Sequence, residues 1–160
     1  MERIQRILSN TAYRENLDKN RAAEEGRRFC CHNMGHFLDV ARIAWIWNLE
    51  EGLGIDRELI YAAALLHDIG RHVQYGNGTP HEEASAAIAP DILRDCGFDN
   101  AEAELILAAV LSHRNEEVMQ ENNLRGLLYR ADKASRACFA CEAEKDCSWK
   151  NGKKNMRVVV

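Results

Sequence analysis

Apolar residues recur every three to four positions along most of the chain, which is the spacing of helices buried on one side. The pattern predicts five helices, at 29–49, 57–68, about 82–95, 100–112, and about 122 to beyond 132. The second contains the run from Tyr61 to Leu66, apolar all round, and is expected to be buried on most sides. Residues 1–25 predict one or two amphipathic helices, packed outside the main core or at an interface, and residues 71–80 predict a polar loop.

The alternating β-branched and aromatic residues of strands are nearly absent before Val158, so the sequence predicts an all-α fold. The 160 residues, 46% hydrophobic and 29% charged, are typical of one soluble globular domain. We expect its core at about 27–137, with N-terminal helices at 1–25 and a cysteine-containing tail at 138–160. The net charge of −4 makes nucleic acid an unlikely partner. No apolar run could span a membrane and no signal segment is seen, so a cytoplasmic location is expected.

The adjacent residues His67 and Asp68 end the most hydrophobic predicted helix. Burying a carboxylate costs several kcal/mol unless a metal or a positive group compensates it, on the order given by transfer data. The pair therefore indicates either a metal site or a helix end at the solvent boundary. Other predicted helices also carry a histidine or an aspartate on an apolar face or at one end, and this recurrence favours a metal. The full set is His36, His67, Asp68, His81, His113 and Asp132.

The ordered set His36, His67-Asp68 and Asp132 resembles the H…HD…D signature of the HD superfamily over about residues 27–137. The segment from Gly35 to Arg42 is similar to the H-x3-V-A-R context of the first ligand, and Ala131-Asp132-Lys133 is similar to the A-D-K context of the last. The resemblance implies a helical, metal-dependent phosphohydrolase.

Mononuclear members of this superfamily use the four ligands alone, and binuclear members add two histidines, which His81 and His113 resemble. The arrangement is similar to small bacterial enzymes that split symmetrical dinucleoside tetraphosphates. HD-type cyclic-dinucleotide phosphodiesterases carry a G-Y-P element that is absent from this sequence. The resemblance implies that Asp68 bridges two ions; with one ion, His81 and His113 would contact substrate or transfer protons. Mixed imidazole and carboxylate ligands suit Fe, Mn, Zn, Co or Ni.

The implied reaction is attack of a metal-activated water on a phosphoester or phosphoanhydride of a small phosphorylated substrate, a nucleotide or dinucleotide. Phosphoryl transfer needs positive groups around the developing charge. The candidates are Arg71 and Lys133, expected to act in catalysis with Asp68, and Arg136 and Arg114, each of which could instead be a surface charge. His72 could position a phosphate or be a loop histidine. Two other functions stay open, a nucleotide-binding sensor without turnover and a di-iron oxygenase.

The cysteines form a second group, because Cys138, Cys141 and Cys147 follow a C-x2-C-x5-C pattern. Cys30 or Cys31 could complete a four-cysteine structural zinc site if the ends of two antiparallel helices approach each other. Unmetallated reduced thiols are the alternative, and Cys96 is expected to be a small core residue. The N-terminal helices and the tryptophans at 45, 47 and 149 could support a homodimer.

Overall fold

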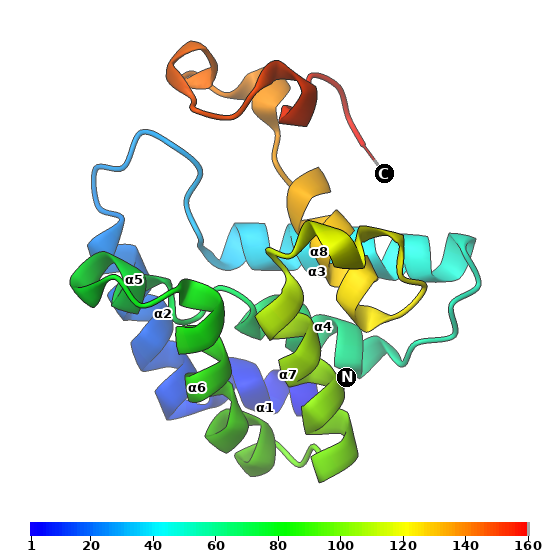
Figure 1. Ribbon diagram of the computed structural model, residues 1–160. Coiled ribbons are helices and arrows are strands. Elements are labelled where there is room, and N and C mark those ends of the chain that lie inside the picture. Colours follow the sequence, from blue (N-terminus) through cyan, green and yellow to red (C-terminus); the bar gives the residue numbers. More distant parts are fainter. Residues whose placement is uncertain (160) are drawn as a thin grey trace.

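The computed structural model describes residues 1–159, which form helices and no β-strand, so the expected all-α fold is confirmed (Figure 1). The α-helices are α1 (Glu2–Ser9), α2 (Thr11–Ala23), α3 (Met34–Glu50), α4 (Arg57–Leu66), α5 (Arg71–Asn77), α6 (His81–Asp95), α7 (Asn100–Ser112) and α8 (Leu124–Ala134). Short 3-10 helices are η1 (Glu116–Gln120), η2 (Cys138–Ala140), η3 (Glu144–Asp146) and η4 (Asn151–Lys153). None of the described helices is both long enough and apolar enough to cross a bilayer.

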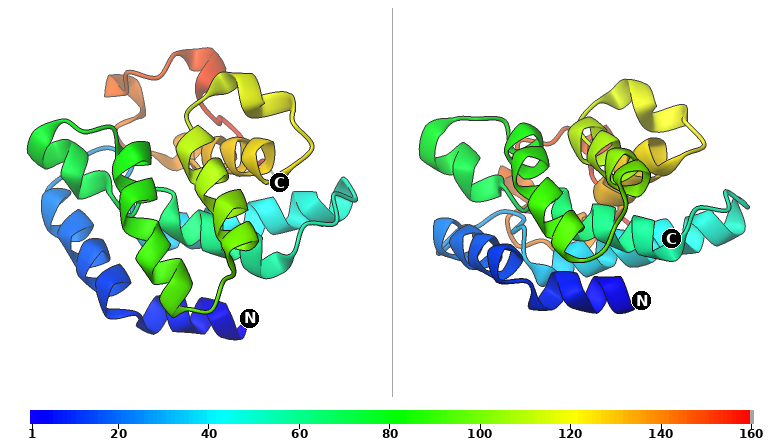
Figure 2. Two further views of the ribbon diagram at one scale, coloured as in Figure 1. Left: turned by 60° about the horizontal axis from the view of Figure 1, so that its bottom comes forward. Right: turned by 90° about the horizontal axis from the view of Figure 1, so that it is seen from below.

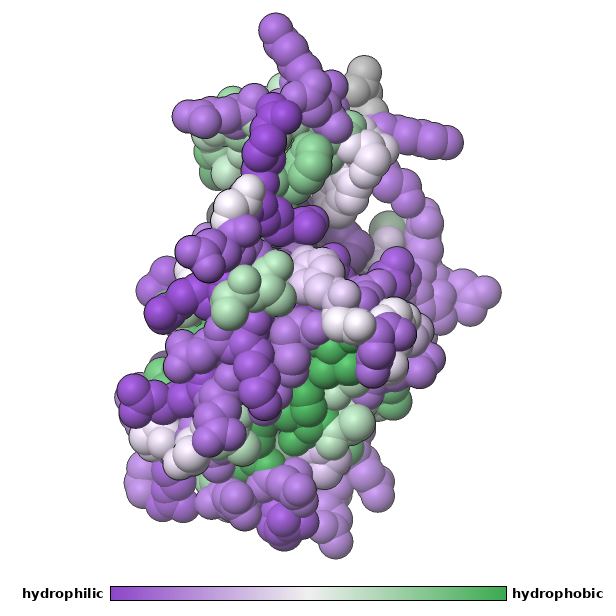
Figure 3. Space-filling model, turned by 90° about the vertical axis from the view of Figure 1, so that its left-hand side faces the viewer, coloured by the Kyte–Doolittle hydropathy of each residue, from purple (hydrophilic) through white to green (hydrophobic). Residues whose placement is uncertain are grey.

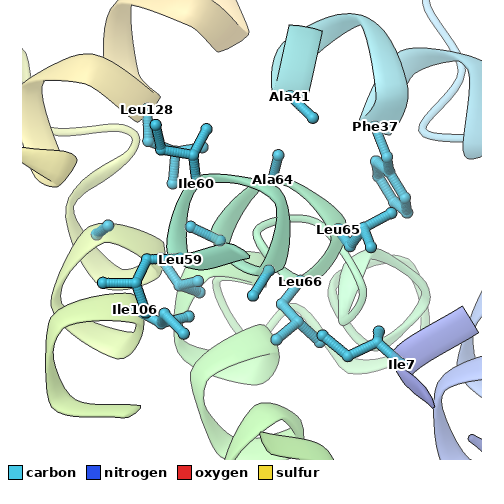
Figure 4. Close-up of a cluster of buried hydrophobic side chains, with 14 of the residues drawn as sticks. Ile7, Phe37, Ala41, Leu59, Ile60, Ala64, Leu65, Leu66, Ile106 and Leu128 are labelled. Atoms are coloured by element: carbon cyan, nitrogen blue, oxygen red, sulfur yellow. The ribbon is translucent and has the colours of Figure 1, made fainter. Parts of the chain in front are cut away.

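Helix α4 lies at the centre of the molecule, as its apolar sequence predicts. Its residues from Leu59 to Leu66 are buried, apart from the half-exposed Tyr61. Figure 4 shows side chains of α1, α3, α7 and α8 arranged around it, from Ile7, Phe37, Ile106 and Leu128 among others. Burial on all sides fixes the end of α4 inside the protein, and that is where His67 and Asp68 follow.

The N-terminal helices are part of the core, and the expectation that they pack outside it was wrong. Ile4 and Ile7 on one face of α1 are buried, and Tyr13 of α2 is fully covered. The two helices run along one side of the helical body (Figure 2). The apolar face of α1 is small, but it covers a surface of α4 that would otherwise be open to water, and α2 packs against α1 and α5.

Several predicted boundaries also need correction. Helix α3 begins at Met34 and not at residue 29, because the Asn33 side chain accepts a hydrogen bond from the His36 backbone and caps the helix there. Helix α4 ends at Leu66, and α8 begins at Leu124 after a cap from Asn123. The predicted loop at 71–80 is largely the helix α5, whose seven residues include no fully buried side chain and so carry no hydrophobic period.

The tail at residues 138–159 forms a lobe above α3 and α8 (Figure 1), and the same lobe projects at the top of Figure 3. Among its described residues, Cys138 and Ala143 are the only buried apolar ones. The Asn155 amide donates hydrogen bonds to the carbonyl oxygens of Lys133, Ala134 and Arg136, and so ties the lobe to the end of α8. The tail is therefore held by polar contacts and not by an apolar core of its own.

Candidate metal centre

The six predicted ligand residues come from five helices and meet at one buried point. His36 lies in the first turn of α3 and Asp132 in the last turn of α8. His81 begins α6, and the other three follow directly after helices. Their ligand atoms form two groups, in each of which all atoms lie within 4.8 Å of one another. The first group is His36, His67, Asp68 and Asp132, and the second is Asp68, His81 and His113.

Asp68 belongs to both groups, and its two carboxylate oxygens face different ones. Oδ2 lies 3.2 Å from Nε2 of His67 and 3.7 Å from Nε2 of His36. Oδ1 lies 3.0 Å from Nε2 of His81 and 3.6 Å from Nε2 of His113. Asp68 is therefore placed as a carboxylate that bridges two ligand groups, one oxygen to each.

Backbone carbonyls orient two of the histidines. Nδ1 of His67 lies 2.7 Å from the carbonyl oxygen of Ala64, and Nδ1 of His113 lies 2.6 Å from that of Val110. A carbonyl oxygen can only accept, so each Nδ1 carries a proton, and Nε2 is the nitrogen that faces the centre and would bind a metal once deprotonated. The acceptor in both cases is three residues earlier, at the end of a helix.

Side chains orient the other two histidines in the same sense. Nδ1 of His81 lies 2.7 Å from Oε1 of Gln74 on α5. Nδ1 of His36 lies 3.2 Å from the Ser135 hydroxyl, which itself donates to the Asp132 carbonyl oxygen and is thus free to accept from His36. Nε2 of each of the four imidazoles faces Asp68 or Asp132, the orientation that metal ligation requires.

The buried charges of the centre fit a cation. Nε2 of His67 and Oδ1 of Asp68 are buried without a hydrogen-bond partner, which is costly unless another group satisfies them. Burial opposes the charged state of each group, yet the carboxylates of Asp68 and Asp132 outweigh it and raise the pKa of His67 to about 9. The histidines in turn hold the pKa of both carboxyls well below the usual range, again against the effect of burial. Two ionised carboxylates among imidazoles suit a divalent transition metal.

Three predicted cations lie at the edge of the centre. Lys133 Nζ donates to Oδ2 of Asp132 at 2.6 Å, and Arg136 Nη2 donates to Oδ1 of the same residue at 3.1 Å. The Arg71 guanidinium contacts the His81 ring. These side chains are therefore close enough to meet an anionic substrate at the centre.

The structure does not bring the other two basic candidates to the centre. Arg114 is half-exposed and pairs with Glu82 at 3.5 Å. His72 binds Asn20 through its backbone N–H and Nδ1, at 2.8 and 3.0 Å, and thus faces α2. Asn20, fully buried, also donates to the Asp68 carbonyl oxygen at 2.9 Å. It links the N-terminal helices to the centre, and no motif in the sequence pointed to it.

His32 also faces the centre and was missed. Its Nε2 lies 3.7 Å from Oδ2 of Asp68, and its Nδ1 contacts the carboxylate of Glu24. Glu24 also accepts from the His32 backbone N–H at 2.6 Å and from the Tyr75 hydroxyl at 2.8 Å. Burial lowers the pKa of His32 to about 4 despite Glu24. His32 lies in the loop before α3, where helical periodicity does not apply, so the sequence pattern gave no signal for it.

A cavity of about 260 Å³ opens beside these residues. Its walls include His32, Arg71 and Arg136 from the helical body, and Ser148 and Trp149 from the tail. The tail therefore covers one approach to the centre, and the body side of the cavity is positively charged.

Comparison with known sequences agrees with this geometry. A sequence model of the HD domain matches residues 33–145. The chain belongs to the HD domain family. An uncharacterized protein of Clostridium beijerinckii is 46% identical to this HD domain protein over 158 residues, which is 99% of either chain. No solved structure matches it. The HD domain defines a superfamily of metal-dependent phosphohydrolases whose members bind divalent metals.

Proposed function

We propose that this HD domain protein hydrolyses a phosphoester or phosphoanhydride bond of a nucleotide, with two divalent ions held at the centre. The observation that carries the proposal is the placement of Asp68, whose two oxygens each face a separate group of histidines. With a single ion in the first group, His81 and His113 would bind no metal, although their Nε2 atoms lie 3.1 Å apart.

The first ion would be held by His36, His67, Asp68 and Asp132, and the second by Asp68, His81 and His113. When bound, such ions supply Lewis-acid activation of water and of phosphoryl oxygens. The protein contributes a fixed set of Nε2 atoms and a site closed by buried helix ends, so little reorganisation is needed on substrate binding.

The cations of the chain would hold the phosphate. Arg71 and Arg136 line the cavity beside the centre, where their guanidinium groups can donate to non-bridging oxygens. Lys133 reaches the centre from the other side and borders a second cavity of about 660 Å³. Trp149 borders both cavities, and an aromatic face beside phosphate-binding cations supports a nucleotide as the substrate class.

The test is phosphate release from mononucleotides, nucleoside polyphosphates and dinucleoside polyphosphates, assayed with each candidate metal. We expect wild-type protein to release phosphate and Asp68→Ala to be inactive. Asp39→Ala is the matched control, because Asp39 is an exposed carboxylate on α3. Release that persists in Asp68→Ala would contradict the proposed site. Nucleotide binding without any release by wild type would indicate a sensor.

Metal analysis tests the number of ions separately. We expect two ions per chain in wild type and one in His81→Ala and in His113→Ala, whose first ligand group is intact. One ion per chain in wild type, with both variants fully active, would contradict the binuclear centre.

A further inference from the structure

Four of the six cysteines meet outside the histidine centre. Cys30, from the loop before α3, borders a cavity of about 50 Å³ together with Cys138, Cys141 and Cys147 of the tail. Cys31 borders a different groove, next to α2, although it is the neighbour of Cys30. Of the two adjacent cysteines, therefore, only Cys30 faces the other three.

We propose that these four cysteines bind a thiophilic metal centre as thiolates. The cavity they share has room for an ion, since one water needs only about 10–15 Å³ of such space. Tight turns place the tail cysteines: the Cys141 N–H donates to the Cys138 carbonyl oxygen, and the Cys147 N–H donates to that of Glu144, both at 3.2 Å. Neither Cys30 nor Cys138 lies in an α-helix, so loops and not helix ends bring them together.

The tail needs such a fastening. With so few buried side chains it lacks the apolar core that would hold a segment of this size, and small segments of that kind are usually held by disulfides or a metal. Lys154 and Glu144 border the same cavity as an ion pair, in which the ammonium donates to the carbonyl oxygen and carboxylate of Glu144 at 2.8 and 2.7 Å. The pair adds no net charge, so a bound metal would itself balance the negative charge of four thiolates.

The spacing of the sulfurs favours one occupant. A zinc ion with Zn–S bonds of about 2.3 Å would bring its four sulfurs to roughly 3.8 Å from one another. Among the described residues, only the two groups at the histidine centre have three or more ligand atoms within 4.8 Å of one another. No three of the cysteine sulfurs lie that close together, so a single zinc ion would have to draw them inward, whereas an iron–sulfur cluster holds its thiolate ligands further apart.

This site would also form a wall of the cavity beside the histidine centre. Cys30, Cys138 and Cys147 border that 260 Å³ cavity as well as the smaller one. A metal held there would keep the tail, including Trp149, over Arg71 and Arg136. The assignment of the cysteine site is nevertheless independent of any phosphohydrolase activity.

The experiment compares Cys30→Ser with Cys31→Ser, after anaerobic purification, by iron, zinc and acid-labile sulfide content and by visible absorption. We expect wild type and Cys31→Ser to contain the same metal centre, and Cys30→Ser and the double variant Cys138→Ser/Cys141→Ser to lose it. Iron with sulfide and visible absorption would identify a cluster; zinc alone would support the site with a single ion. His67→Ala/Asp132→Ala should retain the metal, which separates it from the histidine centre.

Thiol titration of wild type needs no variant. In the native protein we expect Cys31 to react and the four cysteines of the site to be protected. All six thiols should react once the protein is unfolded in denaturant in the presence of a chelator. Equal metal content in Cys30→Ser and wild type would overturn the proposal. Wild-type protein without metal, in which all four cysteines of the site react with the thiol reagent, would overturn it as well.

Discussion

At the scale of single residues, Gln74 shows how a side chain that binds no metal can determine metal affinity. Its Oε1 lies 2.7 Å from Nδ1 of His81, and Nε2 of the same ring lies 3.0 Å from Oδ1 of Asp68. We expect Gln74→Ala to lower the affinity for the second ion by about 10–100-fold, the usual cost of losing such a hydrogen-bond partner. Binding of the first ion should not change. Metal titration by calorimetry measures both. Gln74→Glu keeps the acceptor and should restore affinity; equal affinities in all three proteins would show that Gln74 does not orient His81.

Arg71 and Arg114 provide a matched pair of cations. Arg71 lines the cavity beside the centre, whereas Arg114 is half-exposed and pairs with Glu82. If Arg71 stabilises the charge that develops on phosphate, Arg71→Gln should lower kcat/KM by about 10²–10³-fold. Arg114→Gln should lower it less than Arg71→Gln, because Arg114 pairs with Glu82 and borders only the second cavity, with Lys133. Steady-state kinetics on one substrate checks both, and the reverse order would exchange their roles.

The residues of the centre were largely predictable because each is polar at a place where the sequence is apolar. His36 and Asp132 stand on apolar helical faces, and His67 and Asp68 end the most apolar helix. The residues that orient them were not predictable. Gln74 and Asn20 are ordinary polar residues in the sequence, and only the packing of α5 and α2 against the centre gives them a role.

At the scale of elements, Gly70 allows the start of α6 to approach the turn after α4. A Cβ on Gly70 would lie 2.5 Å from the Ser85 backbone nitrogen and 2.6 Å from the Ala84 carbonyl carbon, and neither backbone atom can move without moving α6. We expect Gly70→Ala to lower the free energy of unfolding by about 1–3 kcal/mol. It should also lower the affinity for the second ion, because the ligand His81 begins α6.

Gly76→Ala is the control for that change. Gly76 lies in α5, where an added Cβ meets nothing within 4 Å, so alanine should be neutral or stabilise the protein by up to about 1 kcal/mol. Urea unfolding of the three proteins measures the difference. Equal stabilities for the two alanine variants would mean that α6 can shift without cost.

The elements themselves were predicted unevenly. The helix at 100–112 has the bounds expected of it, because Asp99 and Glu102 form a capping box that marks its start. Helix α5 was missed because the run Gly76 to Pro80 is typical of a loop and the residues before it have no buried face. Helix α3 starts later than its apolar period suggests because the cap at Asn33 sets its first turn.

At the scale of the whole molecule, the arrangement of the two ends of the chain was the least predictable feature. Ile4, Ile7 and Tyr13 enter a core that their polar surroundings in the sequence do not reveal. The tail lies beside the loop before α3, a contact between distant segments that only the four cysteines suggested. Local periodicity sets each helix, but partners far apart in the chain are chosen by shape and by the charges of the site. The homodimer stays a prediction.

The centre joins five helices through its ligands, so binding of metal should stabilise the whole fold. A metal that binds only the folded protein adds about 2.7 kcal/mol of stability at a concentration 100 times its Kd. For a domain of this length, that corresponds to a rise in Tm of roughly 5–10 °C. We therefore expect the Tm measured by calorimetry to rise with metal concentration after chelation, and to respond far less in Asp68→Ala, which lacks the shared ligand. Asp39→Ala should respond like wild type. A Tm in wild type that is independent of metal would contradict a centre shared by these helices, whatever reaction the protein catalyses.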